Sequence, residues 1–268
     1  MLLAIFLSVL GLCACKSVYC VWFFMVLGSL GVTSWLKSHI FYSSTVLFFV
    51  VSVLGGLFFL LSRIDTHLQG VLLIVSLFLK IGVFPFHFWV LRVLCDLGTS
   101  ALCFFLGPAK VGYLFLLVSS SPSHLGLPLL ALSFGLHLSF CSSSLYLLLY
   151  ASGSCQILFL CLLGGSFFYP FFFAYLLSLF AISSTSYSII SPIVAFLRLG
   201  GVPPLPFFWG KFSAITALPL VWSAVLLLSS GVILHPYMSF ALSGSSSSHS
   251  SPSFTVSISC LAGLPLFL

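Results

Sequence analysis

Charged residues are so sparse in this chain that they cannot form a surface facing water. Only 4% of the 268 residues are Asp, Glu, Lys or Arg, whereas a soluble domain carries roughly a quarter. Hydrophobic residues make up 61% of the chain, and the mean hydropathy is +1.33. We therefore expect a protein that crosses a lipid bilayer several times.

Apolar runs long enough to cross a bilayer follow one another along the sequence. A membrane helix needs about 20 such residues, within a range of about 17–25. Because the first and last runs are short, we expect about nine to eleven helices. We predict an all-α, polytopic bundle of about eleven transmembrane helices in one membrane domain, residues 1–268. The runs are Leu2–Cys15, Val18–Leu36, Ile40–Leu61, Leu68–Leu91, Gly98–Ser119, Leu125–Cys141, Leu145–Gly164, Phe167–Ile190, Pro192–Ala214, Ile215–Leu234 and Phe254–Leu268.

The charge pattern excludes a nucleic-acid-binding protein. The net charge is +6, but the eight Lys and Arg residues lie far apart, whereas nucleic-acid binding needs them clustered on one face. The nine cysteines have no metal-ligand spacing with histidine, so we expect small hydrophobic residues rather than zinc or disulfide sites. The tryptophans lie near the ends of the runs, which is typical of an interfacial aromatic belt.

Lys80 is the first residue that points to chemistry. It lies near the middle of the run Leu68–Leu91, where an ammonium costs about 2.5–3.5 kcal/mol. Its stem is too short to reach the interface, so the amine must face a polar cavity or another helix. In such surroundings a nearby charge could cause the amine to gain or lose a proton. The alternative is a structural lysine whose amine donates to backbone carbonyls. On a continuous helix, His87 would share its face and could pass a proton onward or cap the helix end.

Two more lysines follow glycine and proline interruptions. Lys110 follows Gly107 and Pro108, and Lys211 follows a Gly-Gly-Val-Pro-Pro-Leu-Pro segment. Proline removes an internal hydrogen bond and frees carbonyl groups where a cation can bind. Interrupted segments in two halves of a chain are typical of inverted repeats with an ion path at the midplane, and we assign the halves to 68–141 and 145–234. The predicted helix-break residues are Pro85, Pro108, Pro203 and Pro204.

Residues Leu79–Val90 resemble a conserved pattern of a known family. Lys80-Ile81-Gly82-Val83-Phe84-Pro85-Phe86-His87-Phe88-Trp89 is similar to the Lys-Leu-Gly-x-x-Pro-Phe-His-Phe-Trp pattern of chain 2 of NADH–ubiquinone oxidoreductase, the membrane subunit of respiratory complex I. The segment Leu199–Leu205, followed by Lys211, resembles the Leu-Gly-Gly-Leu-Pro-Pro segment of that family. The resemblance covers roughly residues 20 to 214 and is closest to the animal mitochondrial type, which has about eleven helices.

The resemblance implies a multi-pass protein of the mitochondrial inner membrane. It implies a subunit of an H⁺-translocating NADH:ubiquinone reductase in which Lys80, Lys110, Lys211 and His87 take part in proton translocation. The chain itself would have no redox active site and no cofactor, because FMN, the iron–sulfur clusters and ubiquinone are expected in other subunits. The implied partners are other membrane-arm subunits, including antiporter-like chain 4 and small membrane subunits, together with the lipid bilayer.

The sequence also departs from the family pattern. The glutamate expected on the second helix is absent from Gly28–Gly31, and Cys155 stands where the family has a histidine. The two acidic residues, Asp65 and Asp96, lie beside Arg63 and Arg92 in predicted loops, where we expect solvated ion pairs rather than carboxylates inside the membrane. Two alternatives therefore remain open: a structural membrane-arm subunit that does not pump, and a stand-alone cation/proton antiporter with the same broken helices.

Overall fold

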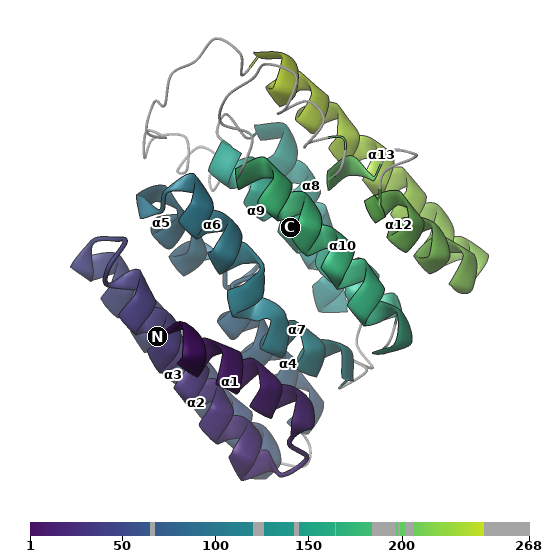
Figure 1. Ribbon diagram of the computed structural model, residues 1–268. Helices are drawn as coiled ribbons and strands as arrows, with labels where there is room; N and C mark the ends of the chain where they lie inside the picture. Colours follow the sequence, from purple (N-terminus) through teal and green to yellow (C-terminus); the bar gives the residue numbers. More distant parts are fainter. Residues whose placement is uncertain are drawn as a thin grey trace. The chain divides into compact units, whose positions relative to one another are not determined.

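The computed structural model describes residues 1–64, 68–119, 126–141, 145–163, 165–183, 197, 199–201 and 206–243, and within them every regular element is helical (Figure 1). The predicted all-α class is therefore confirmed for these residues. The elements are α1 (Leu2–Ala14), α2 (Val18–Leu36), α3 (Tyr42–Ile64), α4 (Gln69–Ile81), α5 (Phe88–Asp96), α6 (Thr99–Leu106), the 3₁₀ turn η1 (Pro108–Lys110), α7 (Val111–Ser119), α8 (Gly126–Cys141), α9 (Leu145–Leu163), α10 (Gly165–Ser183), α12 (Pro206–Ala217) and α13 (Leu220–Ser243).

Four helical stretches in the described part of the chain are long and apolar enough to cross a membrane. They are Val18–Leu36, Tyr42–Ile64, Ala101–Ser119 and Leu220–Ser239. Shorter apolar helices are Leu2–Ala14, Gln69–Ile81 and Phe171–Phe180. The membrane character predicted from the composition therefore agrees with these helices.

Helix α3 has the inside-out surface of a helix in lipid. Its buried stripe contains small or polar residues, including Ser52, Gly55 and Gly56, which let neighbouring backbones approach closely. Its opposite face exposes large apolar residues such as Leu57 and Leu61. A helix on the surface of a soluble protein has the reverse arrangement, because water favours polar residues outside.

The chain divides into two compact units. The first contains Met1–Ala131 and Leu160–Tyr169, and the second contains Leu132–Phe159 and Pro170–Leu268. In the first unit, α2 packs against α1 and α3, α3 packs against α4 and α5, and α7 packs against α1 and α4. This packing buries large side chains that include Met25, Phe78, Trp89 and Phe105. The predicted halves, 68–141 and 145–234, remain a prediction.

Most serine hydroxyls in these helices bond to their own helix. Ser8 donates to the carbonyl of Ile5, Ser62 to that of Phe59, and Ser154 to that of Ala151. Each bond runs to the residue three positions earlier, which satisfies the hydroxyl without a partner from another helix. Ser44 is different, because its hydroxyl donates to the Asp96 carboxylate and thus links the start of α3 to the end of α5.

Three expectations about helix boundaries are wrong. The run Leu68–Leu91 forms two helices, because α4 ends at Ile81 and α5 begins at Phe88. The predicted boundary between residues 214 and 215 falls inside α12, which continues to Ala217. Helix α13 also continues past the predicted end at Leu234, because Pro236 lies inside it. Pro236 has no N–H to donate to the carbonyl four residues earlier, and membrane helices tolerate such a proline. Three residues later, the Ser239 hydroxyl donates to the carbonyl of Pro236 itself at 3.0 Å.

Candidate functional site

A tight turn between α4 and α5 positions Lys80. Gly82 ends α4 in the left-handed conformation with φ +73°, and Pro85 lies within the following turn. A side chain at Gly82 has no room, because an added Cβ would overlap Val90 Cγ2. The Trp89 indole then donates to the Leu79 carbonyl at 3.1 Å, which fastens α5 to the end of α4. The segment that carries the family resemblance is therefore a compact helix–turn–helix.

This turn changes the predicted positions of Lys80 and His87. Lys80 lies in the last turn of α4 and not in the middle of a long helix, so its depth cannot be counted along residues 68–91. His87 is the N-cap residue of α5 rather than a neighbour of Lys80 on one helix face. Its Nδ1 lies 3.3 Å from the Pro85 carbonyl oxygen, and its ring lies 5.6 Å from that of Phe84. Trp89 is only 1% exposed, so its assignment to an interfacial belt is also wrong.

Lys80 and Lys110 line the same small cavity in the first unit. Both side chains are buried, with exposed fractions of 4% and 7%. The cavity has a volume of about 10 Å³, which is near the minimum that one water molecule requires. Among the residues that the structure describes, no hydrogen-bond partner lies near the Lys80 Nζ atom. The arrangement therefore places two amines beside one small internal space.

A helix interruption positions Lys110. Helix α6 ends at Leu106, Gly107 has φ −102° and ψ −94°, and Pro108 begins the 3₁₀ turn η1 that ends at Lys110. The backbone N–H of Lys110 donates to the Gly107 carbonyl at 3.0 Å. Helix α7 then begins at Val111. The tighter turn thus lies between two helical pieces, and Lys110 is held at their junction.

Aromatic rings take the place of carboxylates around these two amines. The Lys80 Nζ lies 5.5 Å from the centre of the Tyr113 ring, and the Lys110 Nζ lies 5.3 Å from that of Phe105. Ring faces carry negative potential and attract a cation within about 6 Å. The residues that line the cavity are all non-acidic: Val32, Phe48, Lys80, Trp89, Phe105, Ala109, Lys110 and Tyr113.

Tyr113 is the residue of this site that sequence reasoning missed. Its hydroxyl donates to the Met25 carbonyl of α2 at 3.3 Å, and it would lie 3.4 Å from a Cβ added at Gly28. Gly28 is in the stretch where the resemblance expects a glutamate, so the tyrosine approaches the place of the missing carboxylate. The available signal was the position of Tyr113 three residues after Lys110, which is one helical turn.

Lys211 lies in the second unit. It lies on α12, is 5% exposed, and donates from Nζ to the Gly200 carbonyl at 3.0 Å. Its Nζ lies 5.0 Å from the centre of the Phe207 ring. Gly201 has φ +72°, and a Cβ added there would lie 2.9 Å from Lys211 Cδ, so the lysine stem packs directly on this glycine. The predicted break residues Pro203 and Pro204 lie outside the described residues.

Two consecutive residues of α9, Cys155 and Gln156, are buried polar residues of the second unit. Cys155, which stands where the resemblance expects a histidine, is fully buried on α9 and interacts electrostatically with Lys211. The Cys155 thiol lies 3.8 Å from the Leu132 carbonyl of α8. Gln156 is 3% exposed, and its Oε1 atom has no hydrogen-bond partner among the described residues. A single amide inside an apolar run is the sequence signal that could have identified Gln156.

The fold and these buried cations define a helical membrane protein with lysines held inside its packed helices. A comparison with protein-family models finds no match to the chain. None of the curated proteins matches it either.

Proposed function

We propose that this chain is a proton-translocating membrane-arm subunit of NADH:ubiquinone oxidoreductase, of the chain-2 family and the animal mitochondrial type. The observation that carries the proposal is the pair of buried lysines, Lys80 and Lys110, that line one cavity beside two helix interruptions. The sequence resemblance over Leu79–Val90 and Leu199–Leu205 supports the same family. The proposal includes a mitochondrial inner-membrane location, about eleven helices and two discontinuous helices.

In the proposed mechanism, protons move between lysine amines in response to charge. A charge change in a neighbouring subunit alters the balance between the protonated and neutral forms of Lys80 and Lys110. Because these amines are buried and have no carboxylate in their cavity, a distant charge acts on them with little screening. Lys211 and His87 are the further proposed members of the path. A neutral amine accepts a proton, and an ammonium returns it, so no bond other than N–H changes.

The chain acts in this proposal as part of an enzyme and not as a redox centre. Quinone reduction and its FMN and iron–sulfur groups belong to other subunits of the complex. The partners are other membrane-arm subunits, including antiporter-like chain 4 and small membrane subunits.

The proposal predicts that Lys80→Met lowers coupled turnover in the assembled complex. Methionine fills a similar volume but cannot carry a proton, and positioned proton-transfer groups contribute on the order of a hundredfold to rate. Turnover and the proton-to-electron ratio are measured per amount of assembled complex, so a loss of assembly is counted separately. Lys37→Met is the matched control, because Lys37 is exposed at the end of α2. Unchanged turnover and stoichiometry in Lys80→Met would rule out this role for Lys80.

The aromatic surroundings of Lys80 favour a second candidate function, a structural membrane-arm subunit without pumping. The glutamate that the resemblance expects is absent, and Tyr113 approaches its place. For this candidate, Lys80→Met would reduce the amount of assembled complex while leaving turnover per complex unchanged. The same experiment therefore separates the two functions.

A further inference from the structure

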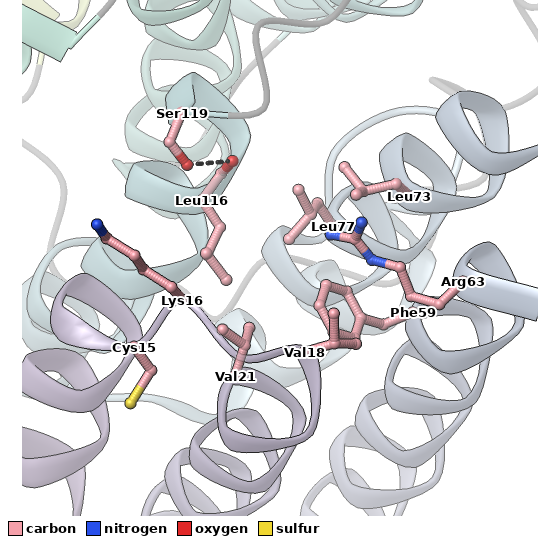
Figure 2. Close-up of a pocket in the computed structure, with 10 residues that line it drawn as sticks. All are labelled: Cys15, Lys16, Val18, Val21, Phe59, Arg63, Leu73, Leu77, Leu116 and Ser119. Carbon is pink, nitrogen blue, oxygen red and sulfur yellow. Dashed lines mark hydrogen bonds between the residues drawn. The ribbon is translucent and has the colours of Figure 1, made fainter.

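A cavity at one end of the helices in the first unit carries two cations. Its volume is about 210 Å³. Lys16 lies in the turn between α1 and α2, and Arg63 lies in the last turn of α3. Figure 2 shows these two residues on opposite sides of the group, with Val21 and Leu116 between them. Neither cation has a role in the proposed proton path, and this inference is independent of that path.

The cavity has a polar rim and an apolar floor. Lys16, Arg63 and Ser119 are exposed, whereas Val21 and Leu77 are buried, with exposed fractions of 6% and 1%. Leu77 lies four residues after Leu73 on α4, so the floor lies roughly 6 Å deeper along this helix. All ten lining residues are non-acidic, which leaves the two cations uncompensated within the lining. Asp96 accepts a hydrogen bond from Ser44 at the start of α3, and Asp65 lies outside the described residues.

Arg63 is held at the rim by an aromatic ring. Its guanidinium carbon lies 5.9 Å from the centre of the Phe59 ring, which also lines the cavity. Phe59 is 3% exposed, so the ring is fixed by packing. A guanidinium presents several N–H donors in a planar fork that matches phosphate oxygens. The Lys16 ammonium, on an exposed and flexible stem, supplies a second charge at the opposite rim.

We propose that this cavity binds an anionic phospholipid. The phosphate diester lies between Arg63 and Lys16, and the first methylene groups of an acyl chain lie against Val21, Leu73 and Leu77. A free phosphate ion would use only the rim, whereas the apolar floor fits the hydrocarbon part of a lipid. The position at the end of apolar helices also places the rim where lipid headgroups meet water, and basic pockets between membrane helices bind such headgroups.

The test compares phosphatidylglycerol and phosphatidylcholine with the same acyl chains. The purified full-length chain is reconstituted with an equal mixture of the two lipids, and the retained lipids are counted by native mass spectrometry. Each cation near a membrane surface contributes about 1 kcal/mol, so Lys16→Gln with Arg63→Gln should reduce the preference for phosphatidylglycerol by roughly thirtyfold. The matched control, Lys37→Gln with Arg92→Gln, removes two exposed cations elsewhere in the first unit and should retain the preference.

A third variant tests the apolar floor. Leu73→Trp fills the cavity without changing a charge, so it should also abolish the retained phosphatidylglycerol. The proposal is overturned if the control loses the preference as strongly as the double variant, because charge then acts diffusely. It is also overturned if Leu73→Trp retains the lipid, or if inorganic phosphate displaces it, because the site then binds only an anion. If the double variant does not fold, Leu73→Trp and Arg63→Lys provide the test instead. The proposal then requires that Leu73→Trp loses the bound phosphatidylglycerol and that Arg63→Lys, which keeps the charge, retains it.

Discussion

At the scale of single residues, the surroundings of Lys80 are aromatic rather than acidic. Its Nζ lies 5.5 Å from the centre of the Tyr113 ring, and the Tyr113 hydroxyl is held by the Met25 carbonyl. This bond anchors the ring to α2, so the ring face stays directed at the amine. A ring stabilises a buried ammonium without forming a permanent ion pair, which leaves the lysine able to lose its proton.

Replacements of Tyr113 should separate its ring from its hydroxyl. Tyr113→Phe keeps the ring and loses one hydrogen bond, which should cost about 1 kcal/mol of stability. Tyr113→Leu also removes the ring from the Lys80 ammonium and should cost about 2 kcal/mol more. The measurement is the fraction of folded protein that survives heating for each variant.

A Lys80→Met background provides the control for these two variants. In this background there is no ammonium for the ring to stabilise. The stability difference between Tyr113→Leu and Tyr113→Phe should therefore be smaller than in the parent chain. An extra cost of the same size in both backgrounds would show that Tyr113 acts by packing alone.

At the scale of elements, the turn between α4 and α5 depends on one glycine. Gly82 needs the left-handed conformation, and its neighbour Val90 leaves no space for a Cβ. The bond from Trp89 to the Leu79 carbonyl closes the same turn from the other side. These contacts give a physical reason for the Lys-x-Gly, Pro and Trp spacing of the segment: the glycine reverses the chain, and the tryptophan holds the reversal.

Gly82→Ala should therefore destabilise the protein by about 3 kcal/mol, the sum of left-handed strain and overpacking. Gly70→Ala is the matched control, because Gly70 lies in the first turn of α4 and a Cβ added there meets nothing within 4 Å. Yields of folded protein and thermal unfolding midpoints should fall for Gly82→Ala and stay near those of the parent for Gly70→Ala.

A double replacement separates the cost of overpacking against Val90 from the other costs of a side chain at residue 82. Gly82→Ala with Val90→Ala removes the overlap with Val90 but keeps the backbone strain and the close contact with Trp89 Cζ2 at 2.8 Å, so it should recover only part of the lost stability. Full recovery would mean that the left-handed conformation is not required at residue 82.

Sequence patterns predicted the helical class and the apolar stretches more successfully than the helix ends. Val18–Leu36 was predicted with the bounds that α2 has, because charged Lys16 and Lys37 flank the apolar run. Within Leu68–Leu91 a break was predicted at Pro85, but the end of α4 at Ile81 and the turn at Gly82 were not, since hydropathy stays high there while the backbone turns. The shared cavity of Lys80 and Lys110 could not be predicted either, because it depends on how α4 and the η1 turn pack together.

At the scale of the whole molecule, successive turns place cations at alternate ends of the helices in the first unit. Lys16 follows α1 and Arg63 ends α3, while Lys37 follows α2. The cavity joins Lys16 and Arg63 directly. The bond from Ser44 to Asp96 brings the end of α5 to the end of α3 that lies nearest Lys37. Helix α5 also carries Arg92, so Lys16 and Arg63 at one end are matched by Lys37 and Arg92 toward the other, and the positive-inside rule assigns no orientation to this unit.

This arrangement predicts a definite labelling pattern in intact membranes. Lys16→Cys and Arg63→Cys should react with a membrane-impermeant maleimide from one side, and Lys37→Cys should react from the other. Label is measured above that taken up by the parent chain, which has cysteines of its own. If Lys16→Cys and Lys37→Cys react from the same side, α2 does not span the membrane between them.

The serine hydroxyls that bond to their own helix have a consequence for evolution. A residue such as Ser62 or Ser154 leaves no orphaned partner on a neighbouring helix when it changes to Ala, Gly or Cys. Such positions can be exchanged one at a time without compensating changes elsewhere. Gly82 and Trp89 have no such freedom, since each meets a defined atom of another segment. Lineages that carry this fold should therefore diverge rapidly along their helices while retaining the turn beside Lys80.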